Sequence, residues 1–68
     1  MNFAEAWALL LDGKRIRRAS WDRGFYWYRS GHSFWQHNPD EPAYPERKGP
    51  IFGEVDIHDA HATDWEEQ

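Results

Sequence analysis

Aromatic residues constrain this chain most, because there are more of them than a core of its size can enclose. The 68 residues include five tryptophans, four phenylalanines and three tyrosines. Each such ring buries roughly 150–250 Å² when it packs, and a chain this short hides only about 60% of the surface that its unfolded form exposes. We therefore expect a single domain, residues 1–68, with some rings at a subunit interface or in a binding pocket.

Small domains usually supplement a thin core with disulfides, a metal or association of copies. The chain has no cysteine, which excludes disulfides and thiolate zinc sites, so we expect a homo-oligomer. No apolar run approaches the roughly 20 residues that span a bilayer, and no basic segment precedes an apolar one at the N-terminus. We expect a cytoplasmic protein without membrane contact.

Charge is divided unevenly along the chain. Residues 1–30 contain six Lys or Arg and three Asp or Glu. Residues 31–68 contain two Lys or Arg and nine Asp or Glu. The net charge of −4 argues against binding of a nucleic acid polymer, which favours a basic protein. A basic segment within an acidic chain favours a small anionic ligand, or an acidic surface on another subunit.

The basic segment is Lys14–Trp21 (KRIRRASW). Arginine donates paired hydrogen bonds to phosphate, and an indole face stacks on a nucleobase. We interpret Arg17, Arg18 and Trp21 as part of a pocket for a small phosphate-bearing ligand. The alternative is an edge strand whose charges face water.

The pattern of elements predicts an α+β fold, in which an N-terminal helix packs on a small antiparallel β-sheet and a short helical turn lies near the C-terminus. A helix is expected over Asn2–Asp12, because Asn2 and Glu5 form a capping-box pattern and apolar residues recur at helical spacing. Gly13 is suited to end it. The expected strands are Lys14–Arg18, Phe25–Arg29, Ser33–His37, Ile51–Val55 and Thr63–Glu66.

Two further segments complete this prediction. Asn38–Pro50 contains all four prolines and is expected to be a long loop, either functional or a mobile surface excursion. Ile57–Ala62 is expected to be a helical turn that Asp56 caps. The hairpin of residues 25–37 carries aromatic residues on both faces, so we expect the helix to cover one face and a second subunit or a ligand to cover the other.

Few residues form a pattern that is typical of catalysis or metal binding. His58 and His61 have the spacing of a metal half-site, but no second cluster accompanies them, and solvated histidines are the simpler interpretation. The serines lack a nucleophile-elbow context, and the glycines are too scattered to cradle a phosphate. We therefore expect no catalytic residues, no metal and no cofactor, and we do not expect an enzyme.

A binding site is the remaining interpretation. Arginines, indole rings and a carboxylate together supply the groups that a nucleotide requires. For Trp65 a place in the core, tying down the chain end, is an equal alternative, and Asp64 could instead cap a turn. The candidate ligand-binding residues are Arg17, Arg18, Trp21, Trp27, Asp64 and Trp65.

Both ends of the chain resemble a known family. Phe3-x-Glu5-Ala6-x-x-x-Leu10, followed by Asp12-Gly13-Lys14-Arg15-Ile16-Arg17-Arg18-x-x-Trp21, resembles the opening of the small phage and prophage proteins known as Thoeris anti-defence sponges. The ending Asp59-Ala60-His61-Ala62-Thr63-Asp64-Trp65-Glu66 is similar to the closing pattern of that family. Ala60 and His61 stand where the family has leucines, and the middle of the chain is short.

The resemblance implies an α+β protomer that assembles as a homotetramer with ligand pockets between subunits. It implies sequestration, without cleavage, of a nucleotide signal that a bacterial immune enzyme makes, namely glycocyclic ADP-ribose. Some relatives also take cyclic oligonucleotides in a separate site. Two alternatives remain: a module that grips and inhibits a host protein, and a metal-dependent enzyme that uses His58 and His61.

Overall fold

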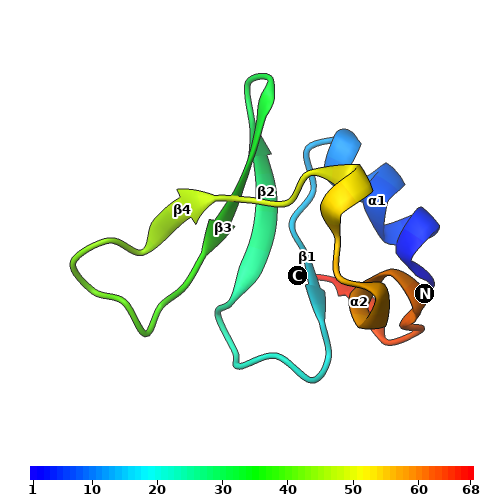
Figure 1. Ribbon diagram of the computed structural model, residues 1–68. Coiled ribbons are helices and arrows are strands. Elements are labelled where there is room, and N and C mark those ends of the chain that lie inside the picture. Colours follow the sequence, from blue (N-terminus) through cyan, green and yellow to red (C-terminus); the bar gives the residue numbers. More distant parts are fainter.

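The computed structural model describes all 68 residues and consists of a five-stranded antiparallel sheet with helices on one side (Figure 1). The strand order is β4-β3-β2-β1-β5. This arrangement confirms the predicted α+β fold. The elements in chain order are α1 (Phe3–Leu11), β1 (Ile16–Arg18), β2 (Tyr26–Ser30), β3 (Ser33–His37), β4 (Glu46–Lys48), the 3-10 turn η1 (Phe52–Glu54), α2 (Ile57–His61) and β5 (Trp65–Glu67).

Helix α1 begins and ends where its sequence signals predict. The Asn2 side chain accepts a hydrogen bond from the Glu5 backbone N–H at 2.9 Å, and the Glu5 carboxylate accepts one from the Asn2 N–H at 3.0 Å. A cap of this kind stabilises a helix by about 1 kcal/mol. Gly13 follows the helix with a φ of 87°, the left-handed conformation that ends a helix at little cost for glycine.

The core lies between α1 and the central strands. Its seven buried residues are Phe3, Ala6, Trp7, Leu10, Ile16, Trp27 and Trp65. Ile16 on β1 is paired with Trp27 on β2, and Arg18 on the same strand is paired with Trp65 on β5. The N-terminal ammonium group donates to the Trp65 carbonyl at 2.9 Å, which joins the two ends of the chain. The two α-helices, of nine and five residues, are too short to form a membrane-spanning segment.

Two predicted segments are wrong. Asn38–Pro50 is not a loop throughout, because Glu46–Lys48 forms β4 between Pro45 and Pro50. This strand pairs only with β3, and an edge strand tolerates flanking prolines because half of its backbone groups need no partner. Ile51–Val55 is not a strand, since the Glu54 N–H donates to the Ile51 carbonyl at 2.8 Å and closes η1.

The other predicted helices and strands are present, with small shifts in their bounds. The hairpin has its turn at Gly31, where φ is 62°, and β3 is the predicted strand Ser33–His37. β1 starts at Ile16 rather than at Lys14, and Phe25 precedes β2. The Asp56 side chain accepts from the His58 N–H at 2.8 Å, which confirms the predicted cap of α2.

Candidate ligand-binding pocket

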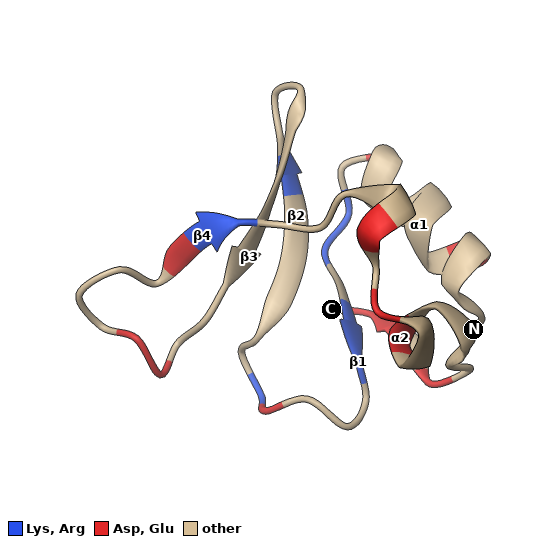
Figure 2. Ribbon diagram, viewed as in Figure 1, with Lys and Arg blue, Asp and Glu red and all other residues tan.

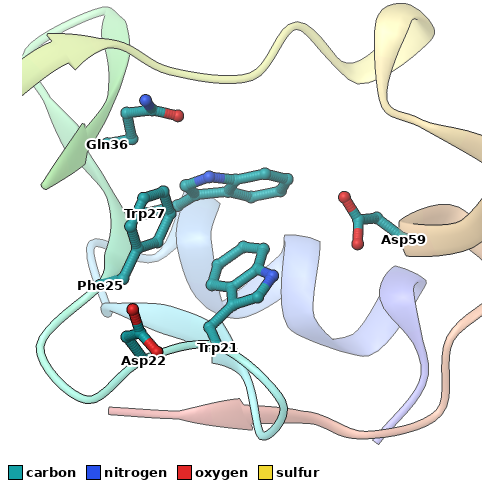
Figure 3. Close-up of a pocket in the computed structure, with 6 residues that line it drawn as sticks. All are labelled: Trp21, Asp22, Phe25, Trp27, Gln36 and Asp59. Carbon is teal, nitrogen blue, oxygen red and sulfur yellow. The ribbon is translucent and has the colours of Figure 1, made fainter. Parts of the chain in front are cut away.

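A pocket of about 450 Å³ opens on the helix side of the sheet, at the end of β1 and β2 that faces α2 (Figure 3). It combines three aromatic rings, two carboxylates and one carboxamide. Figure 3 shows the indole rings of Trp21 and Trp27 between Phe25 on one side and the Asp59 carboxylate on the other. The lining residues are Trp21, Asp22, Phe25, Trp27, Gln36 and Asp59.

The aromatic wall belongs to a larger cluster of tilted rings. The ring centroid of Trp21 lies 5.0 Å from that of Phe25 and 5.1 Å from that of Trp27. Trp65 lies behind them, 5.4 Å from Trp21 and 5.1 Å from Trp27. Such separations are favourable for aromatic pairs, worth about 0.5–1.5 kcal/mol each beyond the buried area. The cluster therefore gives the pocket a wall that is fixed before any ligand arrives.

Backbone hydrogen bonds fix the loop that carries Trp21. Its N–H donates to the Arg18 carbonyl at 3.0 Å, and its own carbonyl accepts from Arg17 Nη2 at 2.5 Å. The Phe25 N–H donates to the Asp22 carbonyl at 3.1 Å, closing a turn around Gly24, whose φ is 88°. A side chain at that φ would be strained, so glycine is required for this turn.

Arg18 joins the pocket wall to the C-terminal segment. Its Nη1 donates to Asp59 Oδ1 at 2.6 Å, and its Nε donates to Asp64 Oδ1 at 2.5 Å. Two hydrogen bonds raise the pKa of Arg18, and the one to Asp64 has a larger effect than the one to Asp59. The bond between Arg18 and Asp64 also lowers the pKa of Asp64. Figure 2 shows the basic residues of β1 beside the acidic ones of α2 and β5. Arg18 thus positions Asp59, a lining residue, from behind.

Arg17 points to the other side of β1. Its Nη1 forms an ion pair with Glu66 Oε1 at 3.0 Å, and its Nε is buried without a hydrogen-bond partner. The other nitrogens of the guanidinium hold Arg17 in place, through its bonds to Glu66 and to the Trp21 carbonyl. Arg23, in the loop that carries Asp22, is exposed and forms no ion pair.

The structure brings the six candidate residues together in part. Trp21 and Trp27 line the pocket, and Trp65 supports them from the core with 2% of its surface exposed. The Trp65 indole N–H donates to the Asp59 carbonyl at 2.8 Å. Arg18 and Asp64 lie behind the wall as an ion pair, and Arg17 is bound to the Glu66 carboxylate and the Trp21 carbonyl.

Sequence reasoning missed four lining residues, namely Asp22, Phe25, Gln36 and Asp59. Phe25 shares the face of Trp27 by the two-residue period of a strand, so the sequence contained a signal for it. The register pairs Trp27 with Gln36, which a hairpin turn at Gly31 also implies. Asp22 and Asp59 approach the rings from a loop and a short helix, and no local pattern encodes that approach.

A second polar network lies on the opposite face of the sheet. The Glu46 carboxylate accepts from the Tyr28 hydroxyl and pairs with His37 Nδ1, while Tyr26 stacks on the His37 ring with centroids 4.9 Å apart. The hydrogen bond to Glu46 raises the pKa of Tyr28 to about 12. The bonds that Glu46 accepts from Tyr28 and shares with His37 lower the pKa of Glu46.

No group of three His, Asp or Glu side chains lies close enough together to hold a metal ion.

Comparison with known proteins found no matching family model, no matching curated protein and no matching solved structure.

Proposed function

We propose that this protein captures a cyclic nucleotide-type immune signal, glycocyclic ADP-ribose or a cyclic oligonucleotide, and holds it uncleaved so that bacterial anti-phage defence is blocked. The observation that carries the proposal is the pocket in which Trp21 and Trp27 stand against two carboxylates. Stacking on a base contributes about 1–3 kcal/mol per base. The resemblance of both chain ends to the Thoeris anti-defence sponges supplies the class of ligand.

Each group of the pocket has a role in this proposal. The base stacks on Trp21, with Trp27 beside it, and Asp22 and Asp59 accept hydrogen bonds from ribose hydroxyls or base amines. Trp65 and Asp64 support the wall. The lining contains no hydroxyl, thiol or imidazole group, which favours retention over nucleophilic cleavage.

Arginine side chains would bind the phosphates of the ligand. Arg17 and Arg18 are paired with carboxylates in the single chain, so a phosphate must replace Glu66, Asp59 or Asp64 as their partner. Arg23 is a further candidate, because it is exposed and shares a loop with Asp22. Arginines of a second copy would serve equally if the protein is a homotetramer.

Association of copies is supported by the apolar surface that the single chain leaves exposed. Ile51, Phe52 and Ile57 expose 58–65% of their surface, and Tyr44 exposes 74%. Burial of these side chains against a second copy would remove their apolar surface from water. The same residues favour the second candidate function, a module that binds and inhibits a host protein.

Calorimetry and thermal shift with a panel of nucleotides test the proposal. The panel holds cyclic ADP-ribose isomers, cyclic di- and trinucleotides, NAD and ADP-ribose, and light scattering reports the oligomeric state in the same samples. We expect one cyclic member to bind tightly and Trp21→Ala to weaken its binding at least tenfold, which corresponds to about 1.4 kcal/mol. Absence of binding across the panel, with a stoichiometric protein retained from host lysate, would replace the proposal by the inhibitor module.

A further inference from the structure

The pocket has a charge opposite to that of a phosphate site. Its lining contains two carboxylates, Asp22 and Asp59, and no Lys, Arg or His. Arg18 offsets part of this charge, since it pairs with Asp59 from behind the wall. The Asp22 carboxylate is exposed at the pocket rim and has no hydrogen-bond or ion-pair partner in the chain. The pocket therefore carries an uncompensated negative charge beside aromatic rings.

The aromatic rings of the pocket also attract positive charge. Trp21, Phe25 and Trp27 are mutually tilted, with interplanar angles of 71° between Trp21 and Phe25 and 58° between Trp21 and Trp27. Tilted rings surround a guest with more than one negative face, and indole is the side chain that attracts cations most strongly. Figure 3 shows the Asp59 carboxylate facing the two indoles across the space that a guest would fill.

We propose that the pocket selects a flat heteroaromatic cation, a ring alkylated on nitrogen, over its neutral and anionic counterparts. Flatness follows from the free face of Trp21, on which a planar ring can stack, and the positive charge follows from the carboxylates of Asp22 and Asp59. This inference goes beyond the proposed function, because it names a cationic ring as a guest of the same pocket and requires neither ribose nor phosphate.

Three small probes of nearly the same shape separate charge from size. N-methylnicotinamidium is a cation, nicotinamide is neutral and nicotinate is an anion, and none of them contains ribose or phosphate. Each is titrated into the full-length protein while the indole N–H signals of Trp21 and Trp27 are followed by NMR. We expect the cation to bind about tenfold more tightly than nicotinamide, and nicotinate to bind least.

Two matched variants test which carboxylate causes the preference for the cation. Asp22→Asn removes the unpaired carboxylate at the rim and should reduce the preference for the cation to about twofold or less. Asp12→Asn removes the same charge from an exposed position that does not line the pocket, and it should leave the preference unchanged. Both carboxylates lack a side-chain hydrogen bond, so neither variant is expected to perturb the fold.

The outcomes distinguish this inference from the proposed function. Equal affinities for the cation and nicotinamide, or shifts confined to other tryptophans, would overturn the inference even if a nucleotide binds in the calorimetric panel. A preference for the cation that Asp22→Asn removes would support it even if no nucleotide of the panel binds. A preference that Asp12→Asn reduces equally would also overturn it, because the cause would then be the net charge of the protein.

Discussion

Trp21 and Trp65 belong to the same ring cluster but have different surroundings. Trp65 is enclosed on all sides and donates its indole N–H to the Asp59 carbonyl. Trp21 is half-buried, and its free face lines the pocket. At the scale of single residues, Trp65 in the Asp-Trp ending therefore supports the core. Trp21 instead exposes a ring face that lines the pocket.

Substitutions at these two positions should separate stability from binding. Trp65→Ala should lower the free energy of unfolding by about 3–5 kcal/mol, a large part of the stability of a domain this small. Trp65→Phe keeps most of the ring and should cost less. Trp21→Ala should cost only about 1–2 kcal/mol, because part of this ring is already exposed. Urea denaturation measures all three, and equal losses for both alanine variants would contradict these assignments.

The ion pair of Arg18 with Asp64 makes stability depend on acid. The pKa of Asp64 is lowered in the folded protein, so the unfolded chain takes up this proton first as the pH falls. The contribution of the pair is therefore complete above the ordinary aspartate pKa and is lost as the pH falls through the lowered value. Wild type should lose free energy of unfolding more steeply than Asp64→Asn below about pH 4.

Chemical denaturation between neutral pH and about pH 2 provides this comparison. Asp12→Asn, which removes an exposed carboxylate without a side-chain hydrogen bond, is the control and should run parallel to wild type. Parallel curves for wild type and Asp64→Asn would show that this pair contributes nothing to acid stability.

At the scale of elements, the edge strand β4 depends on side chains more than on its own length. It has three residues, all exposed, and it pairs only with β3. Glu46 holds it to the sheet through Tyr28 and His37. Gly49 follows so close to β3 that a Cβ there would lie 2.6 Å from the Trp35 backbone nitrogen, so any side chain would push the strand away.

Titration of the tyrosines tests the attachment of β4. The pKa of Tyr28 is raised to about 12, whereas an unperturbed tyrosine titrates near pH 10. Because the pKa is raised on folding, the stability from this bond is present below about pH 10 and is lost as the pH rises through about 12. Ultraviolet absorbance of the phenolate should show one of the three tyrosines titrating late, and Glu46→Gln should return it towards pH 10. A late tyrosine that persists in Glu46→Gln would refute the contact.

The elements that could be predicted from the sequence are those whose signals are local. The capping box of α1, the glycine after it and the strand period of the hairpin depend on neighbours in the chain. The strand β4 was missed because prolines around it argue against a central strand and say little about an edge. The turn η1 was missed because Ile51 and Val55 resemble strand residues when their neighbours in space are not known.

At the scale of the whole molecule, the pocket is assembled from four separate parts of the chain, which explains why only Trp21 and Trp27 of its lining were predicted. Asp22 and Phe25 come from the loop before β2, Gln36 comes from β3, and Asp59 comes from α2. Their meeting depends on the packing of α1 and α2 against one face of the sheet. The arginines that the sequence singled out lie behind this pocket, where carboxylates hold them.

The most direct test of the central claim is recovery of the ligand after binding. The protein is incubated with the cyclic nucleotide that binds most tightly in the calorimetric panel, separated from free ligand and denatured by heat, and the released ligand is analysed by chromatography and mass spectrometry. The account predicts stoichiometric recovery of the intact nucleotide from wild type and little from Trp21→Ala. Recovery of a chemically altered ligand, or equal retention by Trp21→Ala, would contradict it.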